Sequence, residues 1–82
     1  MTTRAEVARW FDEGVAQGAT HMIVVCDTFD WEDYPVYAHS AAEARSKFQD
    51  YSDKSMQQVM EVYALSKPKD PQLAEHRAFH FE

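Results

Sequence analysis

Four carboxylates, with no basic residue among them, lie within one short segment: Asp27, Asp30, Glu32 and Asp33. Carboxylate oxygens at this density bind Ca²⁺ or Mg²⁺ in some proteins. The spacing differs from that of an EF-hand loop, which needs a glycine at its sharp turn, and Phe29 and Trp31 occupy intervening positions. We therefore predict a solvated hairpin tip here and no bound metal.

The histidines and the cysteine are the next candidates for chemistry. His76 and His80 have the four-residue spacing of zinc ligands on a helix, but Glu75 precedes the first histidine instead of following it. Cys26 is the single cysteine, which excludes an intrachain disulfide and favours a reducing cytoplasm. The adjacent Asp27 disfavours a reactive thiolate. We predict no catalytic residue, no cofactor and no enzymatic activity.

The basic residues are scattered along the chain. Arg45 and Lys47 lie near the start of a predicted helix, where, with His39 and backbone N–H groups, they are candidates for binding a small anion such as a nucleotide. The net charge of -6 opposes a nucleic acid partner. No apolar run approaches the roughly 20 residues that span a bilayer, and the N-terminus lacks a signal-peptide core, so we predict no membrane partner and a cytoplasmic location.

Helix and strand patterns define the elements that must position these residues. Thr3 and Glu6 have the spacing of a capping box, as do Ser40 and Glu43, so a helix is predicted to begin at each. The segment 22–26 is apolar and rich in β-branched residues, which predicts a central strand covered on both faces. The expected elements are a helix from about residue 4 that Gly18 ends, strands over 20–28 and 34–39, a helix to about Tyr51, a strand over 56–65, and a short helical turn over 70–76.

These elements predict an α+β domain with the order helix, strand, strand, helix, strand over residues 1–66. The economical arrangement is a three-stranded antiparallel sheet of order 2-1-3 with both helices on one face. The other face must then be covered by the C-terminal extension 67–82, by a second copy of the chain, or by a ligand. The extension is predicted to pack on the domain or on a partner.

The chain carries two tryptophans, four tyrosines and five phenylalanines, more aromatic surface than the core of so small a domain can hide. Aromatic residues outside the predicted core are candidates for interface anchors. Those residues are Phe29, Trp31, Tyr34, Tyr63, Phe79 and Phe81.

The segment from Gly18 to Tyr37, GATHMIVVCDTFDWEDYPVY, resembles a group of small proteins of bacteria and their phages that have no assigned activity. The resemblance continues through 58–63 to 75–80. It transfers no residue role, and it implies only that the chain is similar to small modulators that bind a host protein or sequester a small molecule.

Three functional hypotheses follow from these observations. The leading one is a small non-enzymatic binding or modulator protein that forms a homo-oligomer through its open sheet face and aromatic tail. In this hypothesis a phage encodes the protein, and it acts on a host factor as an anti-defence protein. The alternative is an oligomer that sequesters a small anionic ligand between Arg45, Lys47 and His39. The third is a metal-dependent enzyme that uses the acidic tip with His39 or His80.

Overall fold

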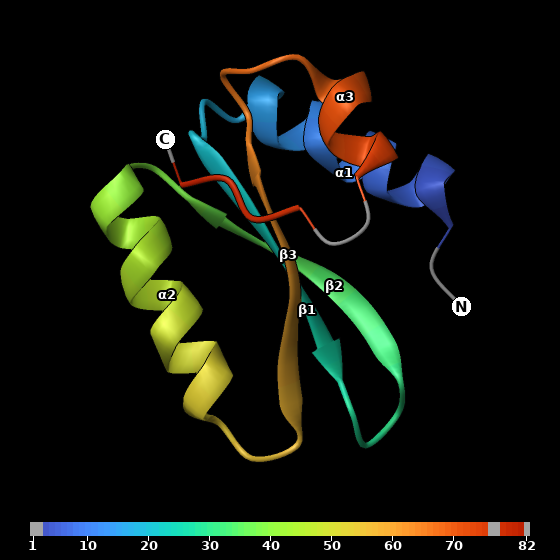
Figure 1. Ribbon diagram of the computed structural model, residues 1–82, viewed down its shortest axis with the longest axis vertical. Coiled ribbons are helices and arrows are strands. Elements are labelled where there is room, and N and C mark those ends of the chain that lie inside the picture. Colours follow the sequence, from blue (N-terminus) through green and yellow to red (C-terminus); the bar gives the residue numbers. More distant parts are fainter. Residues whose placement is uncertain (1–2, 76–77, 82) are drawn as a thin grey trace.

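The computed structural model contains three helices and one three-stranded sheet (Figure 1). It describes residues 3–75 and 78–81. In chain order the elements are α1 (Arg4–Ala16), β1 (His21–Asp27), β2 (Glu32–Ala38), α2 (Ala41–Asp53), β3 (Gln57–Ala64) and α3 (Lys69–Ala74). Within these residues, every helix is too short or too polar to cross a lipid bilayer.

Hydroxyl side chains start both long helices, as the sequence predicts. Thr3 Oγ1 accepts a hydrogen bond from the Glu6 N–H at 3.2 Å, and Ser40 Oγ accepts one from the Glu43 N–H at 3.0 Å. The Glu43 carboxylate also accepts from the His39 N–H at 2.6 Å, and this bond is the main reason why the pKa of Glu43 lies below its usual value. Each cap satisfies backbone donors that a helix start leaves free.

The sheet has the predicted order β2-β1-β3, and both outer strands run antiparallel to β1. The α+β fold class and the order of its elements are thus confirmed. One irregularity interrupts the pairing of β1 with β3: Val24 lies opposite Glu61, but Val25 lies opposite Val59. Met60 is therefore an extra residue in β3, a β-bulge.

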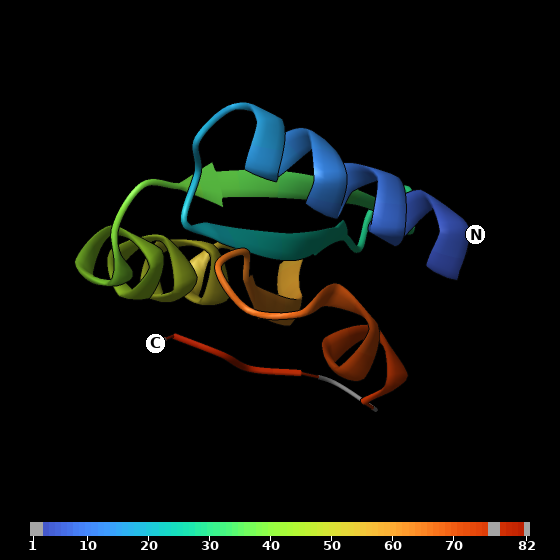
Figure 2. The same ribbon diagram turned by 90° about the horizontal axis from the view of Figure 1, so that it is seen from above.

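The prediction that both helices lie on one face of the sheet is wrong. Figures 1 and 2 show α1 and α2 on opposite sides of it. The core cluster on the α1 side consists of Val7, Phe11, Ala19, Met22, Val24, Tyr63, Leu65 and Ala78. The cluster on the α2 side consists of Ile23, Val25, Val59 and Val62, against which Tyr34, Val36, Phe48, Tyr51 and Phe81 pack.

The apolar character of β1 explains this arrangement. Successive residues of a strand point to opposite faces, so Met22 and Val24 need cover on one side and Ile23 and Val25 on the other. The crossover from β2 through α2 to the parallel strand β3 assigns α2 to one face, and α1 covers the other. In the described residues a helix packs on each face of the sheet, so the wholly uncovered face that self-association was expected to use is not found.

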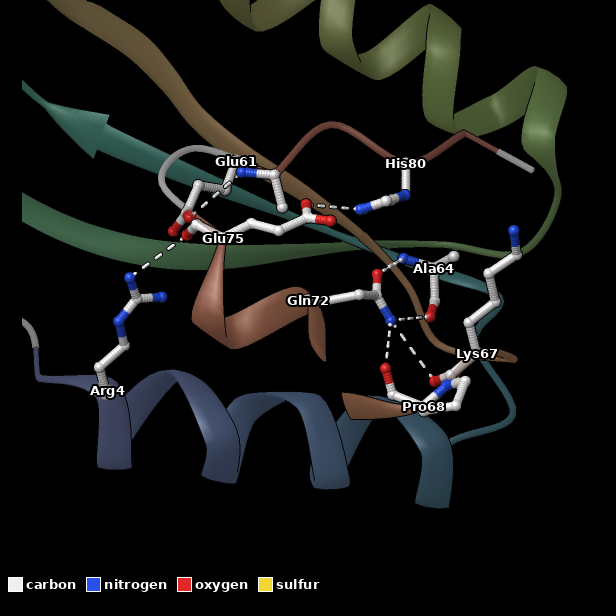
Figure 3. Close-up of polar contacts among 9 residues, drawn as sticks. Arg4, Glu61, Ala64, Lys67, Pro68, Gln72, Glu75 and His80 are labelled. Carbon is white, nitrogen blue, oxygen red and sulfur yellow. Dashed lines mark hydrogen bonds and ion pairs between the residues drawn. The ribbon is translucent and has the colours of Figure 1, made fainter. Parts of the chain in front are cut away.

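The outer edge of β3 is covered by the C-terminal segment 78–81 and by α3. The Val62 N–H donates to the Ala78 carbonyl at 2.8 Å, and the His80 N–H donates to the Val62 carbonyl at 2.9 Å, as in a short parallel strand. Two residues along β3, the side chain of Gln72 performs the same role (Figure 3): its Oε1 accepts from the Ala64 N–H at 2.8 Å and its Nε2 donates to the Ala64 carbonyl at 2.9 Å. The backbone groups of Val62 and Ala64 on this edge are thus paired within the chain.

The outer edge of β2 has a different protection. Pro35 lies in the middle of the strand and has no N–H to offer to another strand. Lys47 Nζ donates to the Tyr37 carbonyl at 3.0 Å and places a charged side chain beside the strand. A proline and a lysine are common means by which proteins prevent edge-to-edge pairing.

Gly14 lies where α1 packs against the sheet, and we expect Gly14→Ala to destabilise the protein by about 1 kcal/mol. A Cβ at this position would be 2.7 Å from Leu65 Cδ1 and 2.7 Å from Tyr37 Cε1. The Tyr37 ring cannot move freely, because its hydroxyl donates to the Trp10 carbonyl at 2.8 Å. Overpacking of about 1–3 kcal/mol then exceeds the roughly 1 kcal/mol that alanine gains over glycine in a helix. Urea unfolding measures the change in the free energy of unfolding. An increase in stability would contradict the prediction and show that the Tyr37 ring moves to accommodate the added Cβ.

Candidate functional site

Three large apolar side chains are exposed at one end of the sheet, and we call them the tip cluster: Phe29, Trp31 and Met56. Their exposed fractions are 71%, 71% and 53%. Phe29 and Trp31 belong to the loop between β1 and β2, and Met56 belongs to the loop between α2 and β3; both loops lie at the lower end of Figure 1. Large exposed apolar side chains gathered at one place typically mark a binding surface.

Backbone hydrogen bonds hold the two loops of the tip cluster together. The Thr28 N–H donates to the Met56 carbonyl at 2.9 Å. Within the hairpin, the Trp31 N–H donates to the Asp27 carbonyl at 2.6 Å, and the Phe29 N–H donates to Asp27 Oδ1 at 2.9 Å. The tip cluster is therefore carried by a hydrogen-bonded loop pair.

Trp31 and Met56 share an unusual backbone conformation. Their φ angles are 58° and 64°, and they are the non-glycine residues with positive φ in the described part of the chain. The left-handed region costs a residue with a Cβ roughly 1–2 kcal/mol, and glycine or asparagine usually occupies it. Both positions thus hold a bulky apolar residue that the backbone disfavours and that the core does not use.

The surroundings of the tip cluster are acidic. The hairpin contributes Asp27, Asp30, Glu32 and Asp33. No ion pair between described residues involves any of these carboxylates. Cys26 lies just before them, where burial and then Asp33 raise the pKa of its thiol. The side chain of Cys26 is buried, as the sequence predicts for a strand cysteine.

The residues predicted to bind a small anion do not form one site. Lys47 reaches β2, where it donates to the Tyr37 carbonyl, and the Arg45 guanidinium lies 5.7 Å from the centre of the Phe81 ring, beyond β3. These contacts are at opposite edges of the sheet. His39 lies beside Glu43, with 3.6 Å between Nδ1 and Oε1, so His39 and Lys47 surround a carboxylate rather than an empty anion site.

The predicted interface aromatics have different environments. Phe29 and Trp31 are exposed, as an interface requires. Tyr34 is half-buried against Tyr51, with 6.5 Å between ring centres, and Tyr63 is fully buried, so the prediction of Tyr63 as an interface anchor is wrong.

The tail aromatics pack on their own chain. Phe81 and Phe79 meet the ring of Phe48 edge-on at 5.4 and 6.0 Å, although Phe79 remains 41% exposed. An aromatic tail that contacts α2 of the same chain has little free surface with which to join a second copy.

The sequence reasoning missed Met56 and Gln72. A single methionine or glutamine in a polar stretch carries no pattern that marks it. Met56 matters because of its backbone angle and its contact with Thr28, and Gln72 because it is only 3% exposed. All of these properties arise from the tertiary structure.

Candidate metal ligands were searched over residues 3–75 and 78–81, and no group of three His, Cys, Asp or Glu side chains is placed to hold a metal ion. His80 Nε2 lies 2.7 Å from the Glu75 carboxylate, and His76 lies outside the described residues. In comparisons with known proteins, no family model, curated protein or solved structure matches the chain.

Proposed function

We propose that this protein is a non-enzymatic binding module that docks, through the tip cluster, onto a basic surface of another protein. The observation that carries the proposal is the pair Trp31 and Met56: both are exposed, both have a strained backbone, and their loops are joined. Bulky residues that cost backbone energy without filling the core point to a role outside the core.

The other surfaces support this choice because a helix packs on each face of the sheet and parts of both edges are occupied within the chain. Both sheet faces are covered by helices, and the β3 edge pairs with residues 78–80. The β2 edge carries Pro35 and the contact between Lys47 and the Tyr37 carbonyl. Among the described residues, the tip cluster holds three of the five large apolar side chains that are exposed.

The charge of the tip favours a basic partner over a second copy of this chain. A symmetric contact through the tip cluster would bring the four hairpin carboxylates of one copy against the same four of the other. Like charges at an interface disfavour association, whereas lysine and arginine side chains on a partner would attract it. Aromatic residues at the centre with charges around them are typical of interfaces whose energy comes from a few residues.

The proposal keeps the modulator hypothesis and replaces self-association with binding to another protein. A host factor of a phage-encoded chain, in a cytoplasm, is the setting that agrees with the resemblance to small bacterial and phage proteins. The sequestering hypothesis loses its support because Arg45 and Lys47 point to opposite sheet edges.

Site-specific photo-crosslinking tests the proposal. The photoreactive residue p-benzoylphenylalanine replaces Phe29 in one variant and Val15 in the control, because Val15 is also exposed, at 52%, but lies on α1. In cells that express the chain, we expect a covalent adduct with another protein from position 29 and none from position 15.

The captured protein is then purified and its affinity for the unmodified chain is measured. We expect affinity to fall as salt rises, because opposite charges attract across the interface, and to fall at least tenfold on Phe29→Ser. The proposal would be overturned if position 29 gave no adduct or if both positions gave equal adducts. It would also be overturned if the affinity changed neither with salt concentration nor on Phe29→Ser.

A further inference from the structure

A small pocket opens on the α1 side of the sheet, between the start of α1, the start of β2 and the middle of β1 and β3. Its volume is about 140 Å³, close to the roughly 150 Å³ of an engineered cavity that holds benzene. The pocket is lined by Thr3, Arg4, Val7, Val24, Asp33, Met60 and Glu61. It shares Asp33 with the acidic surroundings of the tip cluster but includes none of Phe29, Trp31 and Met56.

The pocket carries charges of both signs above an apolar floor. Arg4 and the start of α1 supply positive charge, because the N-terminus of a helix bears about half a positive charge. Glu61 and Asp33 supply two carboxylates, while Val7, Val24 and Met60 supply the apolar surface. Neither a simple anion nor a simple cation matches this combination.

The partners that these charged side chains already have are weak. Arg4 donates to the Glu75 carbonyl at 3.3 Å, and the Ala78 N–H donates to Glu61 Oε2 at 3.4 Å (Figure 3). Both bonds are long for contacts of a charged group, which are usually about 2.7–2.9 Å. Arg4 can donate a stronger hydrogen bond to a ligand, and Glu61 can accept a stronger one from it.

The Tyr63 hydroxyl lies next to the pocket but does not line it. Tyr63 is fully buried, and its hydroxyl has no accessible surface. Burial first, and then the Glu61 carboxylate, raise the pKa of Tyr63, and Arg4 opposes the rise. Glu61 and Arg4, two charged residues that line the pocket, are thus both neighbours of this hydroxyl.

We propose that this pocket binds a small zwitterion, an α-amino acid with a short aliphatic side chain. The carboxylate of the ligand contacts Arg4 at the start of α1, and its ammonium group contacts Glu61 and Asp33. The aliphatic side chain packs on Val7, Val24 and Met60. Because both charges must be matched at once, each half of the ligand alone binds more weakly than the whole.

Titration followed by ¹⁵N–¹H NMR tests the proposal with L-valine as the probe. The matched half-ligands are isobutylamine, which lacks the carboxylate, and 3-methylbutanoate, which lacks the ammonium group. We expect saturable shifts at the amides of Val7, Val24 and Glu61 with L-valine, and at least tenfold weaker binding of each half-ligand. Shifts that do not saturate, or half-ligands that bind as well as L-valine, would overturn the proposal.

Three variants connect the binding to the pocket. Glu61→Gln should weaken L-valine binding by about tenfold or more, because it removes a charge-assisted hydrogen bond. Tyr63→Phe removes a hydroxyl that does not line the pocket and should leave L-valine binding unchanged. Glu13→Gln makes the same charge change at an exposed position of α1 outside the pocket and should have no effect. Equal effects of Glu61→Gln and Glu13→Gln would contradict the assignment.

The test is independent of the partner proposed above. Trp31→Asn removes a residue of the tip cluster and leaves every pocket residue in place. We expect this variant to bind L-valine like the unmodified chain. A loss of L-valine binding in Trp31→Asn would mean that the pocket is not the site of the shifts.

Discussion

Gln72→Met is expected to lower the free energy of unfolding by about 3 kcal/mol, because Gln72 is a buried polar side chain with several hydrogen bonds. Methionine has nearly the same length and helix propensity as glutamine, so packing and α3 itself are preserved. What is lost is the set of hydrogen bonds that Gln72 makes from a position only 3% exposed. For a chain of this size the melting temperature should fall on the order of 15 °C.

The size of the effect follows from what the amide of Gln72 pairs with. Besides both backbone groups of Ala64, its Nε2 donates to the Pro68 carbonyl at 3.0 Å and lies 3.4 Å from the Lys67 carbonyl. Ala64 is itself fully buried, so without Gln72 its N–H stays in the core without a partner. Leaving a buried donor unpaired costs about 1–3 kcal/mol, in addition to the lost bonds to the carbonyls.

Urea unfolding and amide hydrogen exchange measure this prediction. Exchange should accelerate at Ala64, whose N–H loses its acceptor, and at Val62, whose N–H donates to Ala78 in the segment after α3. Gln49→Met is the control, because Gln49 is exposed on α2. A stability loss for Gln72→Met no larger than that for Gln49→Met would show that water replaces the amide at no cost.

The order of elements and the sheet topology are predictable from the sequence because their signals are local. Each capping box involves residues three apart, and the apolar run of β1 is continuous in the chain. The placement of the helices is a different matter. Because β1 is apolar on both faces, a helix must pack on each face of the sheet. The sequence of α1 by itself does not determine on which face α1 packs. The helix positions therefore depend on the topology as a whole.

The bulge in β3 is a second feature that local pattern could not predict. Strict alternation places Val59 with Tyr63 and Met60 with Val62. The extra residue at Met60 reverses this, so Val59 and Val62 face α2, and Met60 packs with the α1 cluster. A bulge shifts every residue beyond it to the other face of the sheet. No glycine occurs at this position to indicate a bulge in the sequence.

The candidate site was predictable in part. Phe29 and Trp31 stand out as aromatics inside an acidic segment, and the structure exposes both. The anion site fails for a reason already present in helical geometry: residues two apart, such as Arg45 and Lys47, lie about 200° apart around the helix and do not face one another. No sequence pattern predicts the pocket beneath α1, because the residues that line it come from four separate segments of the chain.

Trp31→Asn is expected to have opposite effects on stability and on binding. Asparagine adopts the left-handed conformation at lower cost than tryptophan, so relief of the strain at φ 58° should raise the free energy of unfolding by about 0.5–1 kcal/mol. Little packing is lost, because the Trp31 side chain is 71% exposed. A residue kept for the fold would show the reverse, a loss of stability when it is replaced.

Binding to the protein captured from position 29 should fall at least about 30-fold, the loss of 2 kcal/mol that defines a dominant interface residue. Val15→Asn is the control for both measurements, since it removes an apolar side chain 52% exposed on α1, far from the tip in sequence and on a different element. It should leave affinity unchanged. If Trp31→Asn destabilises the chain, or if both variants reduce affinity equally, the strained tryptophan serves the hairpin and not a partner. If stability rises while affinity collapses, the protein gives up folding energy at Trp31 in order to present that side chain to another molecule.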